Sequence, residues 1–159
     1  MKTIRALFHN IRSAHNIGAM LRSADGVGIK EVYVSKIVPL PTDRFGRAQP
    51  EISKTALGAE KDIKINVYED FSSQIKSLKE EGFKIVFVEQ YPSSVKYTDI
   101  HFSKEEKILI CMGEETKGFT EEEISLADVI VEIPMKGNKE SLNVATTFGI
   151  ISFAIRDFI

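Results

Sequence analysis

The residues best suited to chemistry gather in three short segments of the chain. Residues 10–22 carry Asn16 and Arg22 where a predicted strand passes into a predicted helix. Residues 113–118 follow an apolar strand and set two adjacent glutamates between glycines. Residues 133–144 run from a strand through a glycine loop into a helix. Ligands of open parallel sheets bind at the carboxyl ends of strands, which is where the first segment lies.

The first two segments each have a functional and an ordinary interpretation. Arg22 lies about 140° from Ile17 around a helix, so its side chain is predicted to be exposed and able to meet an anion. A solvated arginine is the alternative. Gly113 and Gly118 allow a tight backbone turn around Glu115, although a plain surface loop would have the same composition.

The third segment places polar residues at the start of an apolar helix. Backbone N–H groups at a helix start suit acceptor groups of a ligand. Ser141 alone could cap the helix without any ligand. Asn143, inside an otherwise apolar helix, is harder to explain, because a buried polar group needs a partner.

Apolar strands alternate with helical patterns along the whole chain. This alternation predicts an α/β fold with a parallel sheet and helices on both faces. No linker or repeat divides the chain, so residues 1–159 are expected to form one domain. Asn16 is the expected N-cap of its helix, and Thr120 with Glu123 the expected capping box of another. Strands are predicted at 4–8, 31–35, 63–67, 83–88, 107–112 and 128–133, and helices at 16–27, 52–59, 70–81, 120–127 and 141–159.

The closing helix, residues 141–159, is apolar on nearly every face. One sheet covers only one of those faces, so a second burial partner is required. This pattern predicts a homodimer packed through the closing helix.

Composition is that of a soluble globular protein. The chain has 159 residues, of which 43% are hydrophobic and 28% charged. No apolar stretch approaches the roughly 18 residues of a membrane span, and the start of the chain lacks the apolar region of a signal peptide. The single cysteine, Cys111, cannot form an internal disulfide, which fits a cytoplasmic protein. One cysteine and three histidines in no ligand spacing predict no metal site.

Charge is divided unevenly along the chain. The net charge is −2, but residues 1–64 hold 11 Lys or Arg against 6 Asp or Glu, whereas residues 65–159 hold 10 against 17. A basic half on an acidic protein indicates an anionic partner, and scattered solvated charge is an equally good interpretation. The P-loop and the nucleophile elbow are both absent, and Gly26-Val27-Gly28 precedes a strand, which is the wrong context for a dinucleotide fingerprint.

Taken together, the three segments resemble the SpoU family of RNA ribose 2′-O-methyltransferases, within the SPOUT superfamily. The third segment, IPMKGNKESLNV, is similar to the family motif I-P-M-x-G-x-x-x-S-L-N-V at every defining position. The second is similar to G-N-E-x-x-G, with Glu114 in place of the usual Asn. The first is similar to N-x-R-x-x-x-N-x-G-x-x-x-R, carried here by Asn10, Arg12, Asn16, Gly18 and Arg22.

The resemblance implies a C-terminal part threaded into a deep trefoil knot, a homodimer with its active site at the interface, and S-adenosylmethionine as cofactor. It implies that Arg22 acts on the ribose 2′-hydroxyl. Because arginine does not readily lose its proton, we expect it to hold the 2′-oxygen or a phosphate. Asn16, Glu115, Ser141 and Asn143 would complete the catalytic site. The implied cofactor contacts are Glu89, Gly113, Ile133, Met135, Ser141 and Leu142.

Basic residues of the first half are the expected RNA contacts, with Phe45 as a stacking group. Transfer RNA is the favoured substrate and ribosomal RNA the alternative. A non-catalytic RNA-binding homodimer and a base methyltransferase are rival interpretations; the S-L-N-V motif favours ribose methylation. The expected RNA-binding residues are Arg5, Arg12, Arg22, Arg44, Arg47 and Lys54.

Overall fold

The computed structural model describes residues 2–158. Within them, seven strands form one sheet in the order β3-β2-β1-β6-β4-β7-β5, and every neighbouring pair is parallel. The strands are β1 (Thr3–Phe8), β2 (Glu31–Ser35), β3 (Lys64–Tyr68), β4 (Phe83–Val88), β5 (Val95–Lys96), β6 (Lys107–Met112) and β7 (Val129–Glu132). The helices are α1 (Ala14–Val27), α2 (Pro50–Ala56), α3 (Phe71–Glu80), α4 (Glu121–Ile124) and α5 (Val144–Asp157), with single 3₁₀ turns η1 (Ala59–Lys61) and η2 (Tyr97–Asp99).

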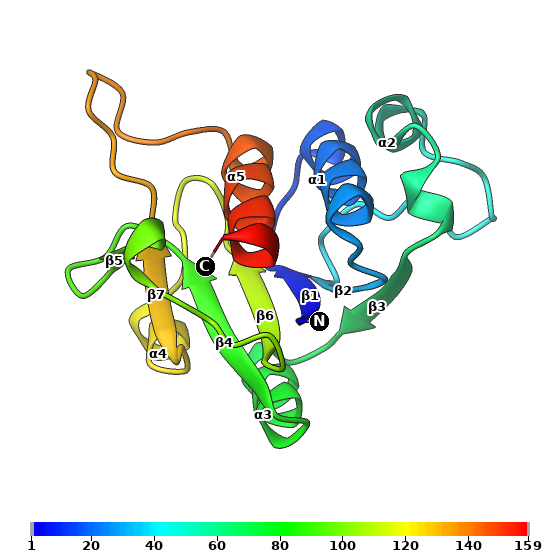
Figure 1. Cartoon of the computed structure of the whole chain (residues 1–159). Helices are drawn as coiled ribbons and strands as arrows, with labels where there is room; N and C mark the ends of the chain where they lie inside the picture. The colour runs from blue at the N-terminus through cyan, green and yellow to red at the C-terminus, as the bar shows by residue number, and fades with distance from the viewer. Residues whose placement is uncertain (1, 159) are drawn as a thin grey trace.

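Helices cover both faces of the sheet, which confirms the predicted α/β architecture (Figure 1). One face packs against α1, α2 and α5 through a core that includes Met20, Ile52 and Phe148. The other packs against α3 and α4 through a second core that includes Ile75 and Phe87. Alternating side chains of each buried strand feed the two cores in turn, as the pleat requires.

The three central strands end at one level. In β1, β6 and β4, Phe8 pairs with Met112 and Met112 with Val88. The segments that follow these strands therefore leave the sheet side by side at its carboxyl edge. This register brings distant parts of the chain to one place.

Two helix starts differ from the prediction. Ser13, and not Asn16, caps α1: its side chain accepts a hydrogen bond from the Asn16 backbone N–H. Asn143, and not Ser141, caps α5, which begins at Val144. Serine and asparagine are equally good caps, so sequence alone could not choose between neighbours.

Other boundaries differ less. The helix predicted at 52–59 divides into α2 and η1, because Leu57 and Gly58 adopt left-handed backbone conformations. The Thr120–Glu123 capping box is confirmed. The two-residue strand β5 has no sequence pattern and was not expected. The predicted closing helix extends to residue 159, which lies outside the described residues.

The closing helix is only partly covered. Phe148, Ile151 and Ile155 are buried, whereas Ile150 and Phe153 remain 37% and 38% exposed. Cys111 lies in the buried core, as predicted. None of the described helices is both long and apolar enough to cross a membrane.

Candidate active site

A cavity of about 620 Å³ opens where β4, β6 and β7 end. Its volume falls within the range of small-molecule sites, roughly 300–1,000 Å³. All six residues predicted to hold the cofactor line it, and so do three of the predicted catalytic residues. The six are Glu89, Gly113, Ile133, Met135, Ser141 and Leu142, and the three are Glu115, Ser141 and Asn143.

A chain of hydrogen bonds joins the three sequence segments at the mouth of this cavity. The Asn143 Nδ2 donates to Asn16 Oδ1 at 3.1 Å, and Asn16 Nδ2 donates to Glu115 Oε1 at 3.2 Å. These residues are separated by 127 and 99 positions in the chain. The fold therefore unites the helix start after β1, the loop after β6 and the helix start of α5.

The Asn143 side chain both caps α5 and bonds across the site. Its Oδ1 accepts from the backbone N–H groups of Ala145 and Thr146, which caps α5, while its Nδ2 reaches Asn16. Its side chain is exposed, so the expectation of a buried asparagine inside a helix was wrong. Capping fixes the amide oxygen on the helix, and this directs the amide nitrogen across the site.

The loop after β6 is shaped by two glycines. Gly118 has φ +61°, a conformation that favours glycine, and a Cβ there would lie 2.0 Å from Glu89 Oε2, so a larger residue would displace that carboxylate. Gly113 lies against the Phe119 ring, 3.0 Å from where a Cβ would stand. Glu89 in turn accepts hydrogen bonds from the backbone N–H groups of Gln90 and Phe119. The predicted tight turn is confirmed.

The cavity is lined by carboxylates and by no lysine or arginine among the described residues. The sequence assigned site roles to Glu89 and Glu115 and named Glu114 only as a departure from the motif. Glu132 and Glu140 were missed, because only the folded sheet edge brings them to the cavity. The five glutamates are Glu89, Glu114, Glu115, Glu132 and Glu140. Such a lining favours a cationic ligand.

S-adenosylmethionine fits this donor set. It carries a sulfonium and an ammonium group, which suit the carboxylates, and an adenine, which suits the apolar side chains of Ile133 and Leu142. Backbone groups of the loops after β6 and β7 would meet its polar edges. The residues present therefore match the cofactor that the sequence predicted.

The predicted RNA-binding residues lie elsewhere. Arg12, Arg22, Arg44 and Lys54 are exposed, do not line the cavity, and form no ion pair with the described residues. Arg22 is placed on α1, beyond Asn16, and no bond joins the two side chains in the described part of the chain.

Two further arginines have partners within the chain. Arg47 is exposed and pairs with Asp43 at 2.8 Å. Arg5 forms ion pairs with Glu31 and Glu81 at the opposite, amino end of β1, which gives it a structural role. Arg5 is therefore a weaker RNA-binding candidate than the sequence indicated.

His9 forms a polar network beneath the site that the sequence did not reveal. It is buried at the end of β1, with Nδ1 2.6 Å from Tyr68 Oη and Nε2 2.9 Å from Glu123 Oε1. Its ring also stacks over Phe119. Burial lowers the pKa of His9, and the Glu123 carboxylate opposes that shift. Burial also raises the pKa of Tyr68, which therefore remains a hydroxyl donor.

Comparison with known proteins places this site in context. A tRNA (guanosine(18)-2′-O)-methyltransferase from Thermus thermophilus is 29% identical over 150 residues, covering 94% of this chain and 72% of that protein. The 23S rRNA (guanosine-2′-O-)-methyltransferase RlmB from Neisseria meningitidis is 28% identical over 145 residues, covering 91% of this chain and 54% of that protein. The chain thus spans about half to three quarters of these relatives.

Solved structures share the fold. The TrmH/SpoU tRNA modifying enzyme of A. aeolicus superposes with a TM-score of 0.82 at 24% identity, covering 98% of this chain and 75% of that one. An AdoMet-bound rRNA methyltransferase from Sinorhizobium meliloti gives 0.83 at 25% identity, covering 97% and 56%. The model of the SpoU rRNA Methylase family matches residues 3–153. The chain belongs to the SpoU rRNA methylase family.

Proposed function

We propose that this protein transfers a methyl group from S-adenosylmethionine to a ribose 2′-hydroxyl of RNA. The observation that carries the proposal is the hydrogen-bonded chain from Asn143 through Asn16 to Glu115 at the mouth of the carboxylate-lined cavity. This chain of bonds joins the cavity proposed to hold the methyl donor, which we call the donor cavity, to the helix that bears Arg22. The names of the similar proteins support the same reaction.

The chemistry demands placement more than activation. When bound, S-adenosylmethionine supplies a methyl group already activated by the positive sulfur. The protein must align the 2′-oxygen with that methyl group and stabilise the negative charge that develops on the oxygen. The bond from the methyl carbon to sulfur would break as the bond to oxygen forms, S-adenosylhomocysteine would leave, and the hydroxyl proton would pass to a nearby RNA phosphate. Arg22 is the proposed group for this charge, since arginine side chains carry a permanent positive charge in proteins. Asn16, held by Glu115 and Asn143, orients the ribose.

Within the cavity, Ile133 and Leu142 are proposed to pack on the adenine. Glu89, Gly113, Met135 and Ser141 complete the proposed cofactor contacts. An Ile133→Asp substitution places a carboxylate against the apolar part of the cofactor. Calorimetry should show a loss of cofactor affinity, and an unchanged affinity contradicts this placement.

A second copy of the chain is proposed to complete the site. Arg22 does not line the cavity of its own chain, and α5 leaves Ile150, Phe153 and Phe158 exposed. A homodimer packed through α5 covers these side chains and offers Arg22 to the partner's cavity. A monomeric mass in solution at micromolar concentration contradicts this arrangement.

Three broader features belong to the same proposal. The C-terminal part, residues 133–158, is proposed to thread a deep trefoil knot, on the strength of the fold shared with SpoU structures. Residues 1–159 are proposed to act as one methyltransferase domain. The proposed location is the cytoplasm, where transfer and ribosomal RNA are modified.

Transfer RNA is the proposed substrate, with ribosomal RNA as the alternative, since relatives acting on each are similar to this chain. The test is methyl transfer from labelled S-adenosylmethionine to unmodified transfer RNA and ribosomal RNA, offered separately and digested to nucleosides for mass spectrometry. A 2′-O-methylated nucleoside from one pool is the expected result. Absence of both transfer and cofactor binding supports a non-catalytic RNA-binding protein instead.

A further inference from the structure

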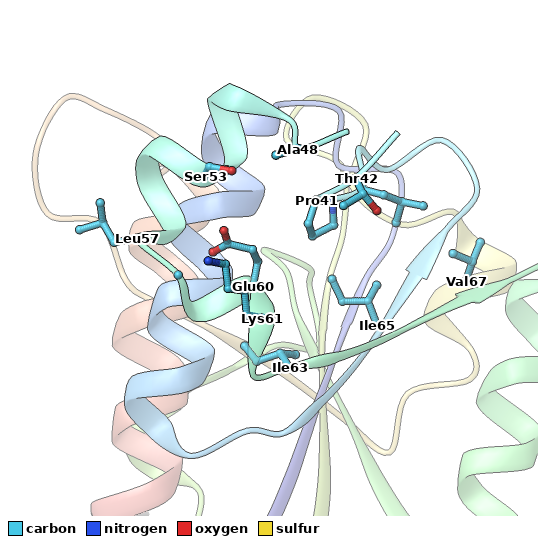
Figure 2. A pocket seen from close by; sticks show the side chains of 12 residues that line it. Pro41, Thr42, Ala48, Ser53, Leu57, Glu60, Lys61, Ile63, Ile65 and Val67 are labelled. Carbon is cyan, nitrogen blue, oxygen red and sulfur yellow. The ribbon is translucent and has the colours of Figure 1, made fainter. Parts of the chain in front are cut away.

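A second hollow, of about 790 Å³, lies on the other side of α1 from the donor cavity. It is bounded by the loop after β2, by α2 with η1, and by the edge strand β3. Figure 2 shows Pro41 and Thr42 on one side, Glu60 and Lys61 on the other, and Ile63 and Ile65 along the floor. We call this hollow the β3 groove.

The β3 groove exposes apolar side chains on a face that the chain leaves uncovered. Leu57 and Val67, which line it, are 65% and 48% exposed, and Leu40 is 36% exposed. Phe45, on the loop that forms one wall, is 66% exposed. Exposed apolar side chains gathered in this way mark a binding surface.

Two arginines lie against Phe45, and one lysine lines the groove. The Arg44 and Arg47 guanidinium carbons lie 4.7 and 5.1 Å from the centre of the Phe45 ring. Lys61 lines the groove, and like Arg44 it has no ion pair among the described residues. An apolar floor with Lys61 beside it and Arg44 and Arg47 on the adjoining loop suits a nucleotide, whose base is flat and whose phosphate is anionic.

The loop tip is held in a defined shape. Asp43 accepts hydrogen bonds from the backbone N–H groups of Phe45 and Arg47 and from Arg47 Nε. Thr42 and Ala48 pair across the base of the loop. The backbone of the loop tip and the Arg47 side chain are therefore held in place, which leaves them less freedom to lose on binding.

One carboxylate favours a base over a purely aliphatic ligand. Glu60 lines the groove, and its Oε2 is buried without a hydrogen-bond partner among the described residues. Such an oxygen is costly to leave unpaired. A nucleobase brings N–H donors that a small rotation of the Glu60 side chain would reach.

One wall of the groove, α2, packs directly against α1. Thr55 Oγ1, on α2, donates to the His15 carbonyl oxygen at 3.0 Å. A Cβ at Gly18 would lie 1.9 Å from the same Thr55 oxygen, so the two helices touch where α1 has no side chain. Since α1 also carries Asn16 and Arg22, an RNA held in the groove is fixed relative to those residues.

We propose that the β3 groove binds an unpaired nucleotide of the substrate RNA, with its base over Ile63 and Ile65 and its phosphates on Arg44, Arg47 and Lys61. This inference rests on the proposed function and adds a subsite distant from the donor cavity. The groove thereby selects RNAs that offer an unpaired base at a fixed distance from the methylated ribose.

The test compares two valines on the two edge strands of the sheet. Val67→Glu places a carboxylate in the groove on β3, and Val95→Glu places one on β5, at the opposite edge, where valine is 39% exposed. We expect Val67→Glu to raise the KM for RNA and the RNA dissociation constant at least about fivefold, the lower end for a lost base stack. We expect kcat at saturating RNA and cofactor affinity to stay within twofold, and Val95→Glu to match wild type.

Phe45→Ala serves as a second variant, because its exposed side chain contributes little to folding. It should also raise KM about fivefold, and Arg44→Ala should lower the slope of log affinity against log salt by about 1. Unchanged RNA affinity in Val67→Glu and Phe45→Ala overturns the proposal. If the wild-type protein methylates no RNA, the proposed function fails. Filter binding of the same transcripts to wild type and variants still tests whether the groove binds RNA.

Discussion

The donor cavity and the β3 groove lie on opposite sides of α1 (Figure 1), and we propose that they bind ligands of opposite charge. The cavity has five glutamates and no basic residue in its lining, whereas the groove has one carboxylate, Glu60, beside Lys61, with Arg44 and Arg47 on the neighbouring loop. The cavity comes from the acidic second part of the chain and most of the groove from the basic first part. The uneven charge along the sequence thus places the proposed site for the cationic methyl donor on one side of α1 and the proposed site for the anionic RNA on the other.

The most severe test of this comparison is Arg22→Ala. Arg22 lies on the helix between the two regions and is proposed to act in the partner's cavity, and removal of a group that stabilises developing charge costs about 100-fold in rate or more. Methyl transfer should fall by that amount, while calorimetry should give unchanged cofactor affinity. Lys76→Ala, on the far face of the sheet, is the matched control. Turnover near wild type excludes Arg22 from the reaction.

Asn143→Asp separates capping from catalysis. An aspartate caps a helix as well as an asparagine, so the melting temperature should hold. The amide donor to Asn16 is replaced by an acceptor that faces Asn16 Oδ1, so kcat should fall about tenfold, the cost of a charged mismatch in one hydrogen bond. Parallel losses of stability and rate would mean that Asn143 matters only as a cap.

Glu132→Gln tests whether the carboxylates of the donor cavity attract the positive charge of the cofactor. Removing one of the cavity carboxylates should raise the dissociation constant of S-adenosylmethionine about threefold, which is the scale of one partly exposed charge pair. S-adenosylhomocysteine, whose sulfur is neutral, should lose less affinity. Titration calorimetry at two salt concentrations measures both, with Glu122→Gln as an exposed control outside the cavity. Equal losses for the two ligands contradict charge recognition.

The smallest effect is expected at His9. Because burial lowers the pKa of His9 in the folded state, acid protonates the unfolded chain more readily. Stability should therefore fall as the pH drops below the ordinary histidine value of 6.5. Urea midpoints at pH 7.5 and 5.5 should differ less for His9→Gln than for wild type, and His101→Gln should behave as wild type. An unchanged difference in His9→Gln removes the buried imidazole as its cause.

Sequence reasoning succeeded where a pattern is local. The strands Glu31–Ser35, Phe83–Val88 and Lys107–Met112 are predicted to the residue, because each is a continuous buried run with polar flanks. The predicted cofactor residues gather in one cavity, because parallel strands release their loops at one edge.

It failed where the answer depends on distant partners. Residue type does not decide between Ser13 and Asn16 as cap, and the choice of Asn143 over Ser141 is accompanied by a hydrogen bond across the site to Asn16. The His9 network joins residues 59 and 114 positions apart, so no window of sequence contains it. The β3 groove is equally invisible, because its walls meet only when α2 packs against α1.

The strand order has a consequence for how the chain folds as it is made. β1, β2 and β3 are neighbours in both sequence and space, so the first part of the sheet can assemble early. β4 pairs only with β6 and β7, both synthesised after it, and one edge of β1 also waits for β6. Until residue 112 emerges, one edge of β1 and both edges of β4 remain open, and such edges recruit other chains. The closing of β6 between them is the step at which folding and aggregation of this protein compete.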